Sequence, residues 1–180
     1  MGLLKNLLKW GAIVIVLLAV ALAGIGSLLS PKFSLSRSVL VNVPPDKVYA
    51  LVADPRGWKQ WSVWNQRDPA MKIDYSGPES GVGATWTWQS KSEGDGKMTF
   101  TAAEPAHRVA FDLYLPDFGT TSKGELRFAP EGSGTRVTWA MSGDMGSNPL
   151  YHWFALGADA MIGPDFEAGL DKLKAVAEKA

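Results

Sequence analysis

Most of this sequence alternates between apolar and polar residues, a period of two that only a β-strand turns into a one-sided surface. Turn sequences separate the alternating runs at residues 94–96, 104–105, 116–119 and 132–134. We therefore predict six or seven antiparallel strands with one buried face. The apolar positions of these runs are Phe33, Leu35, Val39, Val41, Val43, Ile73, Tyr75, Trp86, Trp88, Met98, Phe100, Ala102, Val109, Phe111, Leu113, Leu115, Leu126, Phe128, Val137, Trp139 and Met141.

A long helical segment, residues 149–178, follows the last of these runs. Its apolar residues lie at spacings of three and four and form one stripe, made by Ile162, Phe166, Leu170, Leu173 and Ala177. Gly163 and Pro164 interrupt the segment, so we expect a kink or a break there. A one-sided sheet and a one-sided helix bury their apolar faces against each other. The predicted fold class is α+β, with a curved antiparallel sheet around a long C-terminal helix.

A short helical region should separate the first strand from the others. Pro44 and Pro45 end that strand, and Asp46 is a candidate cap for a helix over residues 47–53. Residues 54–57 break this helix. Three tryptophans then follow at spacings of three, Trp58, Trp61 and Trp64, which places them on one side of a helical turn.

The N-terminal segment differs in character from the rest of the chain. Residues 10–29 contain no charge and are long enough to cross a bilayer as a helix. A retained membrane anchor is one interpretation, and its length favours it. A signal peptide cleaved after Ala21-Leu22-Ala23 is the other. We therefore divide the chain into an anchor or signal segment, residues 1–31, and one domain, residues 32–180.

The charges near this segment favour one location for the domain. Lys5 and Lys9 precede the apolar run, so the N-terminus is expected inside and the domain outside the cytoplasm. If the segment is cleaved, the domain becomes an exported soluble protein.

The remaining composition excludes several classes of function. Residues 32–180 hold 16 basic and 18 acidic residues, so they lack the positive charge of a nucleic-acid-binding surface. The absence of cysteine excludes disulfides, thiolate catalysis and cysteine-based metal sites. No phosphate-binding loop or metal-ligand spacing is present, so we assign no cofactor and no metal. The sequence indicates no protein partner.

Several local motifs resemble those of a known superfamily. They are residues 48–54 leading to Trp58, residues 61–64, residues 68–72 followed by 75–78 and 81–84, and residues 134–139. With the order of elements, they make residues 33–178 similar to the START-related helix-grip superfamily, also called SRPBCC. The resemblance is to its bacterial polyketide cyclase/dehydrase-like branch.

This resemblance implies a cavity between the sheet and the long helix that binds a lipid-like or aromatic molecule. The candidate ligand-binding residues are Trp86, Trp88, Phe100, Phe111, Leu113, Phe128, Trp139, Met141, Ile162 and Phe166. Trp86, Trp88 and Trp139 also fit plain core filling, and the cluster from Trp58 to Trp64 fits a structural role better.

Three functions remain open at this stage. The first is a non-enzymatic binding or carrier domain held at a membrane. The second is a cyclase, dehydrase or hydrolase using the same cavity, which requires a titratable group such as His152, Asp159 or Asp165 inside it. The third is a partner-binding module with a collapsed interior. His107 and His152 lie in no recognisable triad, and Asp112 should point outward, so we assign no catalytic residue.

Overall fold

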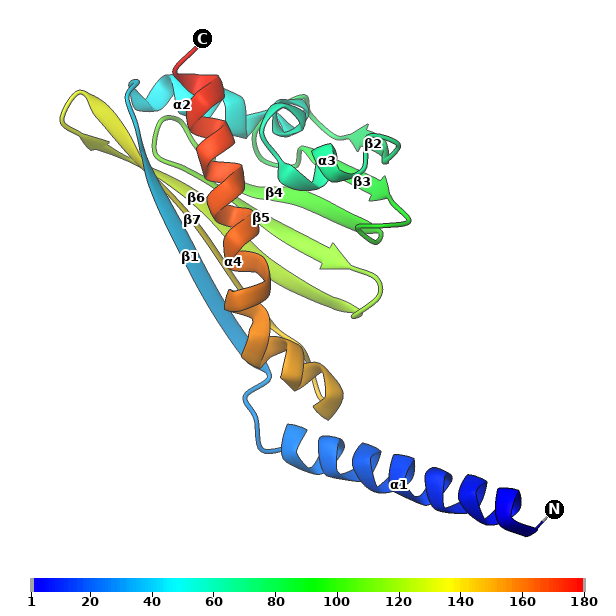
Figure 1. The fold of residues 1–180 in the computed structure, drawn as a ribbon. Coiled ribbons are helices and arrows are strands. Elements are labelled where there is room, and N and C mark those ends of the chain that lie inside the picture. The colour runs from blue at the N-terminus through cyan, green and yellow to red at the C-terminus, as the bar shows by residue number, and fades with distance from the viewer. Residues whose placement is uncertain (1, 180) are drawn as a thin grey trace.

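The computed structural model describes residues 2–179 and contains the expected α+β arrangement, a seven-stranded antiparallel sheet curved around one long helix (Figure 1). The elements in chain order are α1 (Gly2–Gly26), β1 (Lys32–Val41), α2 (Pro45–Ala53), the 3-10 helix η1 (Pro55–Gln60), α3 (Val63–Arg67), β2 (Lys72–Ser76), β3 (Thr85–Gln89), β4 (Gly96–Glu104), β5 (Arg108–Leu115), β6 (Thr120–Glu131), β7 (Gly134–Asp144) and α4 (Pro149–Ala177).

The sheet has the strand order β1-β7-β6-β5-β4-β3-β2, so the chain closes by placing its first strand beside its last. The alternation predicted from sequence is confirmed along the central strands. Leu126 and Phe128 of β6 and Val137 and Trp139 of β7 are buried on the concave face, and their neighbours point outward. Asp112 points outward as expected and pairs with Lys123.

The short helices differ in two details from the sequence prediction. Helix α2 begins at Pro45, and its N-cap is Pro44, which makes no side-chain capping bond. Asp46 therefore lies in the first turn and is not the cap; the fixed φ of proline suits the first helical position, so the helix starts earlier. The three tryptophans are divided between η1, its C-cap and α3, with Asp54 capping η1 by accepting from Arg56 N–H.

Helix α4 runs unbroken through Gly163 and Pro164, so of the predicted kink or break, the break is wrong. Pro164 is exposed, and water can satisfy the carbonyl that loses its helical partner. Gly163 is buried against the guanidinium of Arg37 on β1, which a Cβ at this position would have to displace. Arg37 donates to Asp159, at 2.8 Å, and to Glu167, at 2.6 Å, one turn before and one turn after the glycine. These ion pairs fasten the middle of α4 to the first strand.

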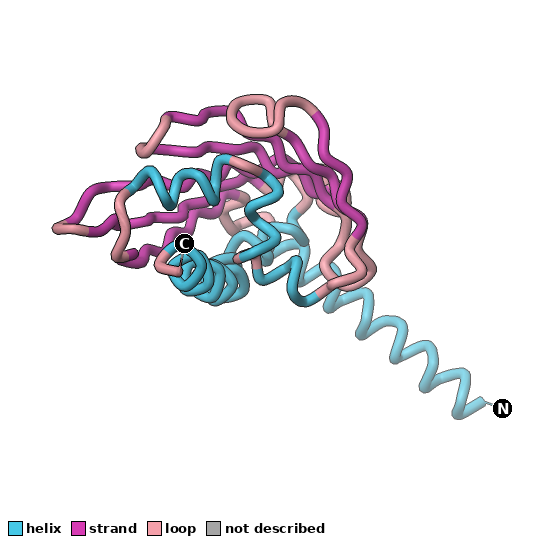
Figure 2. The backbone as a smooth tube through the Cα atoms, turned by 90° about the horizontal axis from the view of Figure 1, so that it is seen from above, coloured by secondary structure: helices cyan, strands magenta, loops and turns pink. Residues whose placement is uncertain are grey.

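Helix α1 projects away from the domain (Figures 1 and 2). Residues 6–26 are long and apolar enough to cross a membrane or to serve as a signal sequence, and the domain leaves most of them uncovered. Only the C-terminal turn of α1 meets the rest of the molecule, at the start of α4.

Candidate functional site

A cavity of about 310 Å³ lies between the concave face of the sheet and α4. Phe118 of the β5–β6 turn, Glu93 of the loop between β3 and β4, and Phe154 of α4 form one end of its lining, which we call the rim or mouth. Its lining is predominantly apolar and consists of Trp58, Ser62, Trp64, Asn65, Met71, Trp86, Trp88, Glu93, Met98, Phe111, Leu113, Leu115, Phe118, Trp139, Met141, Phe154, Ile162, Asp165 and Phe166. Such a lining suits an apolar molecule held in place by a few polar groups at one end.

The structure places eight of the ten candidate ligand-binding residues on this lining. The eight are Trp86, Trp88, Phe111, Leu113, Trp139, Met141, Ile162 and Phe166. Phe100 and Phe128 lie elsewhere. Phe100 packs against Trp58 and Trp86, and Phe128 packs edge-on against Tyr49 of α2. Both point inward as predicted, but the short helices cover them, so they fill the core.

The inner end of the cavity is closed by a cluster of aromatic rings. Trp58 lies 4.4 Å from Trp61 between ring centroids, and Trp139 stacks on Phe166 at 3.9 Å. The indole N–H groups of Trp58 and Trp61 donate to the carbonyls of Val52 and Leu51 in α2, at 2.9 and 3.4 Å. These bonds connect the tryptophan motif to α2, which supports its predicted structural role.

Trp139 has the one buried side-chain nitrogen without a hydrogen-bond partner among residues 2–179. Its ring is met nearly at right angles by Trp58, Trp61 and Trp64. Aromatic ring faces are weak acceptors for an N–H group, so this environment lowers the cost of burying the indole nitrogen.

The outer wall of the cavity comes from residues that the sequence patterns missed. Phe118 lies in the β5–β6 turn, Met71 precedes β2, and Phe154 lies in the first turns of α4, outside the predicted stripe. Turn residues and helix ends carry no periodicity, so alternation could not find them. Phe118 and Phe154 contact each other with ring centroids 5.1 Å apart.

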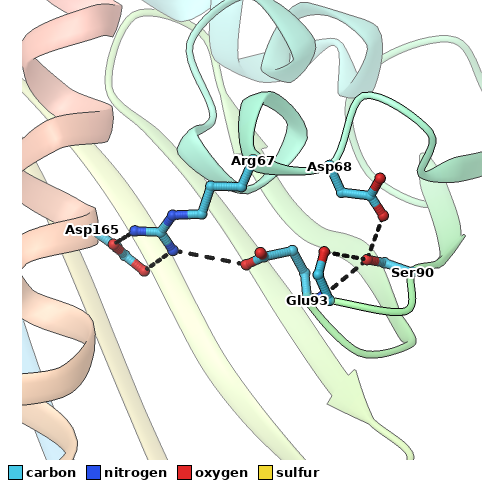
Figure 3. Close-up of polar contacts among 6 residues, drawn as sticks. Arg67, Asp68, Ser90, Glu93 and Asp165 are labelled. Atoms are coloured by element: carbon cyan, nitrogen blue, oxygen red, sulfur yellow. Dashed lines mark hydrogen bonds and ion pairs between the residues drawn. The ribbon is translucent and has the colours of Figure 1, made fainter.

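An ion-pair network lies at the cavity rim (Figure 3). Arg67 of α3 makes a two-pronged contact with Asp165 of α4, and its Nη1 also lies 3.7 Å from Glu93 Oε2 in the β3–β4 loop. We call Arg67, Asp165 and Glu93 the rim latch. The hydrogen bond to Asp165 and the charges of both carboxylates raise the pKa of Arg67. The carboxylate side chains are 16% exposed and the arginine is 48% exposed, so the latch lies at the water boundary.

A second contact joins the end of α3 to the β3–β4 loop. Asp68, which follows α3, accepts a 2.6 Å hydrogen bond from Ser90 Oγ of the β3–β4 loop (Figure 3). On its other side, α3 is held to α4 by the bond from Lys172 to Gln66. Helix α3, with only five residues, is therefore positioned over the cavity by polar side chains on both sides.

The other titratable candidates lie outside the cavity. His107 is exposed in a turn, and Asp159 is exposed and bonded to Arg37. His152 is buried, with its ring nitrogens 2.8 Å from Gly26 O and 3.0 Å from Gly146 O. A neutral imidazole can donate to only one of these carbonyls, and the protonated form can donate to both. His152 therefore joins α1 to the domain, and Asp165 is the one predicted titratable candidate on the lining.

A larger hollow, of about 870 Å³, lies on the outer face of the sheet. Outward-pointing side chains of five strands form most of it, and its charges pair with one another, as Arg108 does with Glu125 and Lys123 with Asp112. It is open and polar, so it lacks the enclosure that small-molecule sites require.

Comparison with known proteins gives a consistent assignment of fold. Residues 32–178 match the profile of a family described as polyketide cyclase / dehydrase and lipid transport. No curated protein matches the sequence significantly.

Three solved structures illustrate the similarity. Norcoclaurine synthase from Thalictrum flavum, in complex with dopamine and hydroxybenzaldehyde, is 14% identical, with a TM-score of 0.62 over 86% of this chain and 91% of that chain. The di-domain ARO/CYC StfQ from the steffimycin biosynthetic pathway is 12% identical, with a TM-score of 0.62 over 82% of this chain and 51% of that chain. Protein MLL2253 from Mesorhizobium loti is 19% identical, with a TM-score of 0.59 over 82% of this chain and 98% of that chain. At these identities the likeness shows a common helix-grip fold.

Proposed function

The chain belongs to the polyketide cyclase/dehydrase and lipid-transport family, and from that premise we propose that it binds an apolar small molecule in its cavity while α1 holds it at a membrane. The observation that carries the proposal is the unfilled, predominantly apolar cavity, whose two charged side chains, Glu93 and Asp165, belong to the rim latch. A chain that needed this volume only for its core would fill it, because protein interiors pack with few voids larger than a water molecule.

The distribution of polar groups supports an amphipathic ligand. Ser62, Asn65, Glu93 and Asp165 are the polar side chains on the lining, and the two carboxylates belong to the rim latch. An apolar body would occupy the space between Trp88, Leu113 and Ile162. A hydroxyl or amine end at the rim could donate to Glu93 or Asp165.

Helix α1 supports the second half of the proposal. Its exposed apolar surface is costly in water and matches the hydrocarbon thickness of a bilayer. A tether also suits a carrier, because it keeps the cavity close to lipids and to lipid-soluble molecules.

The open interior argues against a partner-binding module with a collapsed core. An enzyme is the weaker alternative. The lining contains no histidine, lysine or tyrosine among residues 2–179, and Arg67 pairs with both of its carboxylates. General acid–base catalysis would require one of them to leave this pairing.

Native mass spectrometry of the full chain, released from membranes in a mild detergent, tests the proposal. We expect a bound apolar species on the wild type, to be identified by extraction. Leu113→Trp, which places an indole in the cavity, should abolish it. Tyr114→Trp is the matched control, because Tyr114 is the next residue of β5 and is exposed; this variant should keep the ligand.

Two outcomes would count against the proposal. Retention of the ligand by Leu113→Trp would place it outside the cavity, and a wild type free of ligand would remove the carrier function. The intact mass of the same sample shows whether residues 1–31 are retained, and a cleaved chain would overturn the tether.

A further inference from the structure

The end of α1 is fixed to the start of α4. Trp153 Nε1 donates to Leu22 O at 3.0 Å, and His152 Nδ1 lies 2.8 Å from Gly26 O. Gly26 is buried so closely against the backbone of Pro149 that a Cβ would not fit there. The anchor and the domain therefore meet through a short, packed joint.

This joint determines how deep the first turns of α4 lie, if α1 crosses the bilayer as proposed above. Leu22 lies four residues before the end of α1, which is about 6 Å along a helix rising 1.5 Å per residue. A side chain bonded to Leu22 O then lies beside the last turn of the span. That depth is the interfacial zone of the bilayer, where tryptophan is enriched.

Exposed leucines surround the same joint. Leu28 is 86% exposed in the connection between α1 and β1, and Leu150 and Leu156 on α4 are 52% and 65% exposed. With Trp153 they form what we call the apolar collar. It is continuous with the exposed apolar surface of α1, so the partner that covers α1 also reaches the collar.

The collar lies next to the cavity mouth. Phe154 follows Trp153 in sequence, lines the cavity and contacts Phe118 of the β5–β6 turn. Figure 1 shows α1 leaving the domain toward the side on which this turn lies. The cavity wall and the anchor joint are thus neighbouring faces of the same helical turns.

We propose that the apolar collar seats in the interfacial zone of a lipid bilayer and turns the cavity mouth toward the membrane. This inference rests on the proposed membrane tether. The collar contacts lipid, because it continues the apolar surface of α1, whose length and composition suit a bilayer. A ligand then exchanges between membrane and cavity past Phe118 and Phe154, without crossing bulk water.

The absence of cysteine makes a direct test possible, since any introduced cysteine is the sole labelling site. The full chain is reconstituted in phosphatidylcholine vesicles with an environment-sensitive nitrobenzoxadiazole label at one of four exposed positions. Val16→Cys reports on the anchor, Leu156→Cys on the collar and Asp117→Cys on the cavity mouth. Val82→Cys, also apolar and exposed but in the β2–β3 connection, is the matched control.

Spin-labelled lipid should quench the labels at Val16→Cys and Leu156→Cys strongly, the label at Asp117→Cys less, and the label at Val82→Cys least. A label at Leu156→Cys or Asp117→Cys quenched no more than at Val82→Cys, with Val16→Cys still quenched, would overturn the collar and leave the tether intact. An unquenched label at Val16→Cys would overturn the tether itself. If the label at Leu156→Cys becomes shielded from water as the protein concentration rises, independently of lipid, the collar contacts a second copy of the chain. That result would overturn the proposal.

Discussion

The two ends of the concave face are built from the same kinds of residues and behave differently. At the inner end, α2, η1 and the C-terminal half of α4 cover the sheet, and Trp61, Phe100 and Trp139 are at most 1% exposed. At the outer end, α3 and the first and middle turns of α4 lie over the sheet, and the cavity remains. Inward-facing aromatic residues therefore form either a packed core or the wall of an open cavity, depending on which helix lies above them.

The largest expected effect is a difference in the free energy of unfolding between tryptophan substitutions at the two ends. Trp61→Ala removes a fully buried ring and its hydrogen bond, and should cost about 3–5 kcal/mol of unfolding free energy. Trp88→Ala at the outer end, where the ring is only partly buried, should cost less, about 1–3 kcal/mol. Denaturant unfolding of the full chain in detergent measures both. Equal losses would mean that the outer end is as tightly packed as the inner end.

A smaller effect concerns the cover of the outer end. Arg67→Ala removes the rim latch, whose partly exposed ion pairs should contribute less than about 1 kcal/mol to stability. Amide hydrogen exchange over residues 63–67 should nevertheless become faster, because α3 loses its bonds to α4 and to the β3–β4 loop. Arg127→Ala, which breaks a surface pair on β6, is the control. Unchanged exchange in α3 would show that Trp64 and the bonds of Gln66 and Asp68 hold this helix without Arg67.

The smallest effect tests the border between the two ends, where Arg37 holds the middle of α4. The hydrogen bond from Arg37 lowers the pKa of Asp159 below its ordinary value of 3.8. The ion pair therefore stabilises the folded chain above that pH and is lost as the pH falls through the lowered pKa. The melting temperature of the wild type should be slightly higher than that of Asp159→Asn near neutral pH, and the two melting temperatures should converge below pH 3.8. A difference that persists in acid would contradict this assignment.

The sequence predicted the inner end better than the outer end. Alternation located Trp139 and Phe111, and helical spacing located Phe166 and Leu170, because both periods follow directly from burial on one face. Phe118 and Phe154 escaped because a turn and a helix end have no period. The rim latch escaped for another reason. Arg67 and Asp165 are 98 residues apart, and no local pattern relates charges that meet only after the chain has folded.

The two errors in the helices have a local origin. Asp46 and Pro45 both favour a helix start, and the proline decided the position. The pair Gly163 and Pro164 ordinarily ends a helix, but Arg37 pairs with α4 on both sides of it and the solvent-facing proline leaves the axis free to continue. Tertiary contacts outweighed the local preference of the chain at this site.

The closely packed indoles at the inner end also give the molecule an optical property. Between ring centroids, Trp58 lies 4.4 Å from Trp61 and 5.3 Å from Trp86, and Trp61 lies 5.4 Å from Trp139. At such separations the transition dipoles of the rings couple, so these chromophores absorb as a group and should produce a strong near-ultraviolet circular dichroism signal. Trp88 and Trp153 lie apart from this group and are only partly buried. Near-ultraviolet ellipticity therefore reports on the packed end of an unlabelled polypeptide.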